Sequence, residues 1–157
     1  MTIAALFLFC ASLLGVVSAI LITGNRGMDI MATIGIAAIA FLSPATAAWL
    51  LVSSAVVVAA MHTQWTSCHR GLTVGFLALL LGAALFLSRE LATLVWVGGA
   101  YFTLRHIHVL SEWWLGNLAA PGLRGYLRYQ LFLPVIMAGP IHRLPHFDRQ
   151  CRRRRVS

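Results

Sequence analysis

The chain has 157 residues, of which 60% are hydrophobic and 10% are charged, and its mean hydropathy is +0.85. A small soluble domain has too much surface for its volume to bury so many apolar side chains, and disordered chains are poor in apolar residues. The composition therefore excludes most soluble enzymes and disordered proteins. It predicts an integral membrane protein of at most about six spans, because each span needs about 20 apolar residues.

The charge is basic and concentrated at one end of the chain. The formal net charge is +8, and half of the twelve arginines lie in the last 15 residues. A basic cluster beside a membrane span is typical of a cytoplasmic anchor and attracts anionic headgroups. No stacking aromatic residues accompany the arginine run at 152–155, so no nucleic-acid partner is expected. We expect residues 1–142 to form a multi-pass domain in the inner (cytoplasmic) membrane and residues 143–157 to form a cytoplasmic tail.

The first predicted element is an apolar helix at Ile3–Ile22, which is uncharged and long enough to span a membrane. A cleaved signal peptide is the rival interpretation. Residues 1–2 supply no basic n-region, and the apolar run is longer than such a signal requires. We therefore expect a retained helix, followed by a glycine-flanked turn at residues 23–29.

The next apolar stretch, residues 30–61, is too long for one straight span and too short for two full ones. The Ser43-Pro44 pair divides it, because proline breaks the helical hydrogen-bond ladder and restricts the residue before it. The sequence predicts two short helices, Ile30–Leu42 and Ala45–Ala60, as a tilted pair or as a re-entrant hairpin packed inside the protein. A single kinked helix is the simpler alternative.

A polar loop is expected at residues 62–70, before an uncharged span at Gly71–Ser88. His62, Cys68 and His69 in this loop are residue types that bind metals, but their spacing fits no zinc site. A solvated loop is therefore favoured over a metal site.

Leu91–Leu115 is predicted to be a helix that is apolar at first and polar later. Four polar residues recur on one face at i, i+4, i+7 and i+11. They are Tyr101, Arg105, His108 and Glu112. Charges this close to a span usually face a bundle interior or a water-filled cavity, although Arg105 and Glu112 are about 10 Å apart along the axis. The equal alternative is an amphipathic helix end in the headgroups, with Trp113 and Trp114 at the interface.

The chain shows no catalytic constellation of its own. Its four acids lie far apart in sequence, and it has no Gly-x-Ser-x-Gly elbow, P-loop or His-Glu-x-x-His motif. His142, His146 and Asp148 are residue types of a metal triad, but Pro145 between the histidines spoils a one-face helical geometry. A basic surface is favoured there, and neither a metal nor a cofactor is expected.

After a loop at Gly116–Gly125, the last apolar segment is expected at Tyr126–Pro140, and the two regions complete a distinctive passage. A glycine-led helix with a Tyr-Phe-Thr-Leu pattern and an acid ends at a turn glycine, and a later segment ends in Pro-x-x-x-Ala-Gly-Pro before a basic residue. The residues concerned are Tyr101, Thr103, Glu112, Gly116, Pro134, Ala138, Gly139, Pro140 and Arg143. In order and spacing, the stretch from Gly98 to Asp148 resembles the membrane-bound O-acyltransferases, in the branch of the alginate O-acetylases and the teichoic-acid D-alanyl transfer protein.

The resemblance implies an all-α polytopic membrane bundle of about five to six hydrophobic helices, with a partial acyltransferase fold. Such proteins transfer an acyl group, often acetyl, to a hydroxyl of a cell-envelope polysaccharide, and a buried histidine is expected to act as general base. Membrane lipid is then a partner. The acyl donor and the polysaccharide acceptor would be engaged through a missing carboxy-terminal half or through a partner protein.

The departures from the family pattern carry as much information as the match. Members of the family are much longer, and their catalytic histidine lies in a run such as Arg-Arg-Trp-His, downstream of the Ala-Gly-Pro motif. None of the six histidines here lies in such a run, Glu112 replaces the usual aspartate, and Leu115 stands where the turn has its arginine. We therefore expect an amino-terminal portion, inactive alone, as a truncated or frameshifted gene would encode.

Two alternatives stay open at this point. The first is a non-catalytic membrane protein that serves as partner or anchor of a complete acyltransferase. The second is a small transporter subunit, which is suggested by the polar face from Tyr101 to Glu112.

Overall fold

The computed structural model describes residues 3–22, 25–63, 67–90 and 99–132. Within them the chain forms six α-helices and no β-strand, which confirms the all-α prediction. The helices are α1 (Ile3–Leu21), α2 (Asn25–Leu42), α3 (Pro44–His62), α4 (Ser67–Glu90), α5 (Gly99–Trp114) and α6 (Leu123–Gln130).

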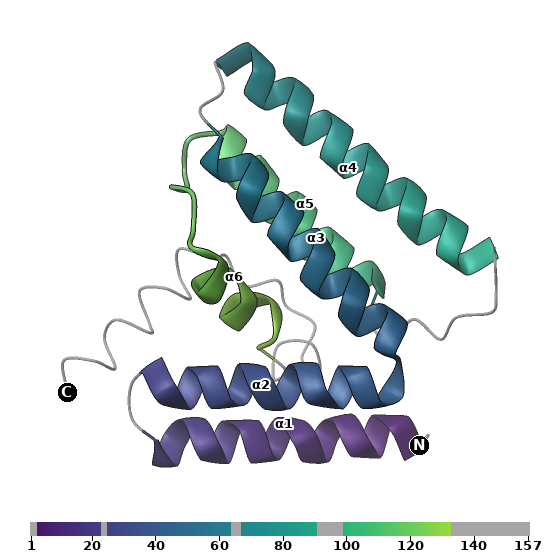
Figure 1. Ribbon diagram of the computed structural model, residues 1–157, viewed down its shortest axis with the longest axis vertical. Helices are drawn as coiled ribbons and strands as arrows, with labels where there is room; N and C mark the ends of the chain where they lie inside the picture. Colours follow the sequence, from purple (N-terminus) through teal and green to yellow (C-terminus); the bar gives the residue numbers. More distant parts are fainter. Residues whose placement is uncertain (1–2, 23–24, 64–66, 91–98, 133–157) are drawn as a thin grey trace.

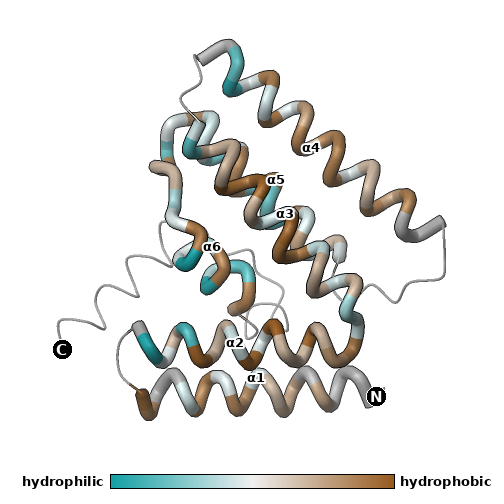
Figure 2. The backbone as a smooth tube through the Cα atoms, viewed as in Figure 1, coloured by the Kyte–Doolittle hydropathy of each residue, from teal (hydrophilic) through white to brown (hydrophobic). Residues whose placement is uncertain are grey.

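The helices form two groups, which are joined by α6 and by direct contact between α2 and α3 (Figure 1). Helices α1 and α2 lie side by side and antiparallel, whereas α3, α4 and α5 run together in a different direction. The short α6 lies between the two groups and contacts both α2 and α3. Strongly hydrophilic residues gather on α6 and at the left-hand ends of α2, α3 and α4 (Figure 2).

The division between α2 and α3 follows from Ser43 and Pro44, as the sequence predicts. The Ser43 hydroxyl accepts a hydrogen bond from the backbone N–H of Thr46 at 3.3 Å, and the Thr46 hydroxyl donates to it at 2.9 Å. Proline in the first turn costs no internal hydrogen bond, because the first helical N–H groups have no partner within the helix. The result is two separate helices that cross at a wide angle rather than one kinked helix (Figure 1).

Three predicted boundaries are wrong in the same direction. α2 begins at Asn25, inside the predicted turn at residues 23–29; α4 begins at Ser67, inside the predicted loop; and α6 begins at Leu123, before the loop was expected to end. Each of these first turns holds an exposed polar side chain: Arg26 in α2, His69 in α4 and Arg124 in α6. A polar stretch alone therefore does not show that a helix has not yet begun.

The third of these boundaries also changes the last apolar segment. The expected segment from Tyr126 starts inside α6, which ends at Gln130, and its residues 133–140 lie outside the described chain. The residues 91–98 of the predicted fifth helix also lie outside it, and α5 itself begins at Gly99.

The core is built where α6 meets the second group of helices. One buried cluster joins α3, α4, α5 and α6 through residues such as Val57, Leu77 and Leu110, and another joins α2, α3 and α5 around Leu50 and Phe102. The first group packs closely because Gly15 of α1 has no side chain: a Cβ there would stand 2.9 Å from Cγ of Met31.

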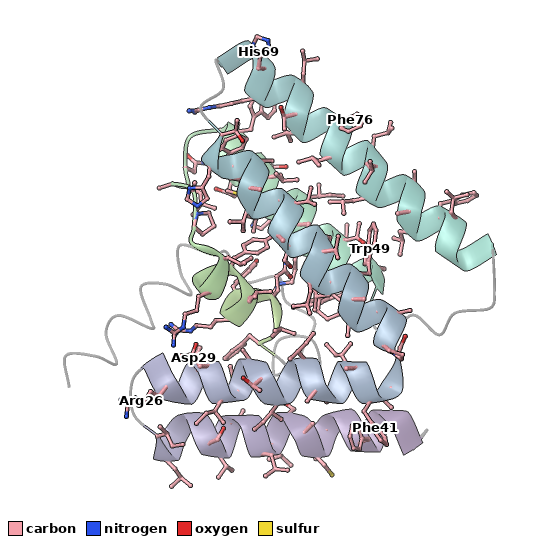
Figure 3. The ribbon with its side chains drawn as sticks, in the orientation of Figure 1. Arg26, Asp29, Phe41, Trp49, His69 and Phe76 are labelled. Atoms are coloured by element: carbon pink, nitrogen blue, oxygen red, sulfur yellow. The ribbon has the colours of Figure 1, made fainter. Side chains whose placement is uncertain are left out.

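Two of the described helices, α3 and α4, are long and apolar enough to cross a membrane. The candidate spans are Pro44–His62 and His69–Leu87, each of 19 residues, with mean hydropathy values of 1.8 and 2.0. Helix α4 packs on α5 along one side and exposes a row of large apolar side chains on the other. These include Leu72, Phe76, Leu79, Phe86 and Leu87, and Phe76 points away from the other helices (Figure 3).

Helix α5 ends in a hydrogen-bonded turn that requires a glycine. Gly116 has φ of +77°, its N–H donates to the carbonyl of Trp113 at 3.1 Å, and the N–H of Asn117 donates to the carbonyl of Glu112 at 3.0 Å. This pair of bonds defines a Schellman motif, in which the left-handed residue after the helix is usually glycine. The turn glycine singled out in the sequence therefore has a conformational reason to be glycine.

We predict that Gly116→Ala lowers the free energy of unfolding by about 1 kcal/mol, because a Cβ is strained at positive φ. The measurement is unfolding in detergent micelles followed by circular dichroism. Gly75→Ala in α4 is the matched control, since nothing lies within 4 Å of a Cβ added there. Alanine favours a helix interior, so the control should be neutral or stabilising. Equal effects of both substitutions would contradict the prediction.

Candidate functional site

A buried polar cluster joins α3, α5 and α6 at the imidazole of His106. The Nδ1 atom of His106 lies 2.6 Å from the hydroxyl of Tyr126, and its Nε2 atom lies 3.0 Å from the hydroxyl of Ser53. The side-chain nitrogen of Gln130 lies 3.0 Å from the same Nδ1 and 3.1 Å from the Tyr126 hydroxyl. All four side chains are buried, so one imidazole links three helices.

The donors and acceptors in this cluster can be assigned from Ser53 at one end and Gln130 at the other. Ser53 donates its hydroxyl proton to the carbonyl of Leu50 at 3.2 Å, so its oxygen accepts from Nε2–H of His106. Nδ1 then accepts from the Tyr126 hydroxyl, which itself accepts from the amide of Gln130. A neutral imidazole with its proton on Nε2 satisfies both ring nitrogens. This chain of bonds runs in one direction from α6 through α5 to α3.

Arg105, the neighbour of His106 in sequence, is a buried cation that caps α6. Its side chain is 1% exposed. The guanidinium donates to the carbonyl of Tyr129 at 2.5 Å and to the carbonyl of Gln130 at 3.4 Å, and it lies 3.9 Å from the centre of the Tyr129 ring. The last carbonyls of a helix have no internal partner and carry partial negative charge. They therefore supply the compensation that a buried cation needs.

The sequence of α6 explains why both contacts form. Tyr126, Tyr129 and Gln130 fall at i, i+3 and i+4, so they share one face and are buried. Arg124 and Arg128 are one turn apart on the other side, and both contact Asp29 of α2. α6 is thus amphipathic, with a polar buried face and a cationic outer face.

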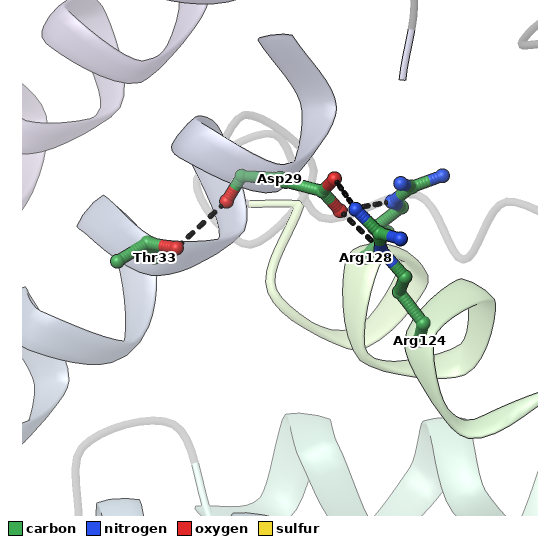
Figure 4. A network of polar contacts seen from close by, with 4 residues as sticks. All are labelled: Asp29, Thr33, Arg124 and Arg128. Atoms are coloured by element: carbon green, nitrogen blue, oxygen red, sulfur yellow. Dashed lines mark hydrogen bonds and ion pairs between the residues drawn. The ribbon is translucent and has the colours of Figure 1, made fainter. Parts of the chain in front are cut away.

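The outer face of α6 is tied to α2 by ion pairs (Figure 4). Nε of Arg128 lies 2.6 Å from Oδ1 of Asp29, and Arg124 donates to both carboxylate oxygens. Hydrogen bonds from Arg128 and then Arg124 lower the pKa of Asp29 from 3.8 to about 2. The Asp29 carboxylate therefore stays ionised well below neutral pH.

The structure brings together part of the predicted polar face. Tyr101 and Arg105 are in contact, with the guanidinium donating to the Tyr101 hydroxyl at 3.2 Å. His108 and Glu112 are only partly buried, and no contact described in this part of the chain joins either of them to Arg105. The Nε2 atom of His108 is buried and has no hydrogen-bond partner among the described residues. Arg105 faces the bundle interior, whereas the face as a whole does not form one site.

The residues that carry the family resemblance divide between the described and undescribed parts. Thr103 is buried on α5, Tyr101 contacts Arg105, and Gly116 forms the turn. The second half of the pattern lies outside the described residues: Pro134, Ala138, Gly139, Pro140 and Arg143, together with His142, His146, Asp148 and the arginine tail.

Sequence reasoning missed His106, Ser53, Tyr126 and Gln130. A signal for His106 was present, because it falls in the 3–4 spacing of the buried positions of α5, between Phe102 and Val109. A histidine in an otherwise apolar stripe indicates a buried side chain with hydrogen-bond partners. Its partners come from other helices, so the sequence does not identify them.

The cluster has the connectivity of a nucleophile, a base and an orienting group, with Ser53, His106 and Tyr126 in those places. However, Ser53 and His106 are both buried, and the hydrogen-bond directions place a proton on the nitrogen that faces Ser53. In this state the cluster joins helices and does not activate the hydroxyl. Within the described residues, no group of three His, Cys, Asp or Glu side chains is placed to hold a metal.

Comparison of the chain with known proteins found no match among family models, curated proteins or solved structures.

We predict that Tyr126→Phe lowers the free energy of unfolding by about 1–3 kcal/mol, because it removes a hydroxyl that serves buried partners on α5 and α6. Tyr101→Phe is the control, since Tyr101 is only partly buried and water can replace its hydroxyl. The measurement compares both variants with the parent chain by denaturant titration in mixed micelles. A loss no larger for Tyr126→Phe than for Tyr101→Phe would show that the cluster does not hold α6.

We also predict that acid weakens the contact between α2 and α6. The pKa of Asp29 is about 2 in the folded chain against 3.8 for the free side chain. The ion pairs therefore stabilise the fold fully above pH 3.8, and this contribution is lost as the pH falls towards 2. Because Asp29 is partly exposed, the loss is on the order of 1 kcal/mol. Unfolding measured between pH 5 and pH 2 should show this dependence, and Asp29→Asn should reduce it; an unchanged dependence in Asp29→Asn would refute the assignment.

Proposed function

We propose that this chain is the amino-terminal part of a membrane-bound O-acyltransferase-like protein that does not catalyse transfer by itself. The whole protein would move an acyl group, such as acetyl, to a hydroxyl of a cell-envelope polysaccharide. The observation that carries the proposal is the passage from Gly98 to Asp148, in which the helix pattern, the turn glycine and the Pro-x-x-x-Ala-Gly-Pro segment follow one another in the order and spacing of that family.

The described part of the passage supports the proposal through positions where residue type matters. Thr103 is buried, the Tyr101 hydroxyl accepts a hydrogen bond from buried Arg105, and Gly116 has a left-handed conformation. Each of these positions restricts the side chain by burial, by a specific contact or by backbone strain. A pattern made of such residues is less easily met by chance than a pattern of exposed ones.

A multi-pass location in the inner membrane, with the carboxy terminus in the cytoplasm, forms part of the proposal. Helices α3 and α4 have the length and composition of spans, and the outer face of α4 is apolar along most of its length. Contiguous apolar surface of this kind requires lipid or another protein to cover it. The arginine tail supports the orientation.

The proposed lack of independent activity rests on the histidines. A general base must reach the hydroxyl of the acceptor through an open site. His106 is the best-placed histidine of the described chain, but it is buried and both of its ring nitrogens have partners. The run in which the family has its catalytic histidine does not occur in the sequence.

A non-catalytic membrane partner or anchor of a complete acyltransferase is the second candidate. The apolar face of α4 favours it, because α4 contacts α5 on one side and leaves Phe76 and Leu79 uncovered on the other. Co-purification with a complete enzyme, weakened by Phe76→Ala, would support this candidate over the first.

We predict that the 157-residue chain integrates into membranes and transfers no acetyl group by itself. Expressed in cells that lack polysaccharide O-acetylation, the chain should resist extraction by alkaline carbonate and leave the acetate content of the envelope polysaccharide at background. Extraction as a soluble protein would contradict the membrane location. Acetylation above background would overturn the proposal of inactivity.

A further inference from the structure

Three arginines lie at the start of α2 and on the outer face of α6. Arg26 and Asp29 occupy the same end of α2 (Figure 3), and Arg124 and Arg128 reach that end from α6 (Figure 4). Arg26 is exposed, and the side chain of Arg124 is 76% exposed even though it pairs with Asp29. We call Arg26, Arg124 and Arg128 the α2–α6 arginine site.

The α2–α6 arginine site has more donors than its single carboxylate can accept. Both oxygens of Asp29 are already used by Arg124 and Arg128, and Nη2 of Arg128 is buried without a hydrogen-bond partner among the described residues. Three guanidinium groups against one carboxylate leave two positive charges in excess. Guanidinium groups pair best with planar or tetrahedral oxyanions that accept several hydrogen bonds, such as carboxylates and phosphates.

Exposed apolar side chains adjoin the arginines along the chain. Leu21 and Ile22 at the end of α1 precede the start of α2, Ile30 follows Asp29, and Leu123 precedes Arg124; all four are exposed. A free inorganic anion would contact only the guanidinium groups. A lipid would place its headgroup phosphate on the arginines and its acyl chains along the apolar residues.

We propose that the α2–α6 arginine site binds the phosphate of an anionic phospholipid at the membrane surface. The lipid competes with Asp29 for Arg124 and Arg128, and Arg26 supplies a further cation. The site rests on the membrane location given under the proposed function, but it needs no acyl transfer. Its three arginines are not part of the arginine run at 152–155, which lies outside the described residues.

The test uses the full chain in detergent, titrated with short-chain phosphatidylglycerol or phosphatidylcholine, with bound lipid counted by native mass spectrometry. The parent chain should prefer phosphatidylglycerol. Arg124→Gln with Arg128→Gln should weaken phosphatidylglycerol binding about thirtyfold and leave phosphatidylcholine binding unchanged, since each surface arginine contributes about 1 kcal/mol to anionic lipid binding. Arg70→Gln with Arg89→Gln is the control, because it removes the same charge from α4.

Asp29→Asn separates lipid binding from loss of structure. This variant lacks the ion pairs between α2 and α6, so a purely structural role predicts weaker binding of lipid. If the carboxylate competes with the headgroup, its removal should instead raise phosphatidylglycerol affinity, even though the fold is less stable. Weaker binding in Asp29→Asn, or an equal loss in the α4 control, would overturn the proposal.

Three further outcomes would each contradict the lipid proposal in a different way. Displacement of phosphatidylglycerol by millimolar inorganic phosphate at constant ionic strength would show a general anion site and would refute the lipid assignment. Recovery of the chain as a soluble protein would defeat the proposed function and this inference together. A membrane-integrated chain without lipid preference would defeat this inference alone.

Discussion

The docking of α6 is the constraint on which the buried polar cluster depends. α6 has eight residues, and an isolated helix of that length is unstable in water because nucleation costs more than so few hydrogen bonds return. It is held by His106 and Arg105 on its inner face and by Asp29 on its outer face. Since α6 contacts both α2 and α3, these contacts also connect the two groups of helices.

The inner contacts depend on compensation for buried polar groups. A buried cation without compensation costs several kcal/mol, and no carboxylate of the described chain is paired with Arg105. Two carbonyls at the end of α6 and the ring of Tyr129 take the place of a carboxylate. The planar guanidinium suits this arrangement because it donates in its plane and stacks through its face, which an ammonium group cannot do. Arg105 thus stabilises the end of a helix that in turn buries Arg105.

The sequence predicts the features of this fold that depend on local chemistry. The break at Ser43-Pro44 and the turn at Gly116 follow from backbone restrictions of single residues, and both are present. The starts of α2, α4 and α6 were predicted wrongly, because a polar first turn looks like a loop when its tertiary contacts are unknown. His106 was missed for a related reason: its partners Ser53 and Tyr126 are 53 and 20 residues away, and no local pattern joins them.

The two faces of α6 differ in how they respond to their surroundings. The inner contacts are buried, so salt and pH reach them only when the helices separate. The outer contacts are formed by partly exposed Asp29 and Arg124 and compete with any anion that approaches. Loss of the outer contacts would leave α6 held by its inner contacts with His106 and Arg105. α6 therefore contacts the partly exposed charge of α2 on one face and the buried polar cluster on the other, so the two regions are linked although the cluster itself is not exposed.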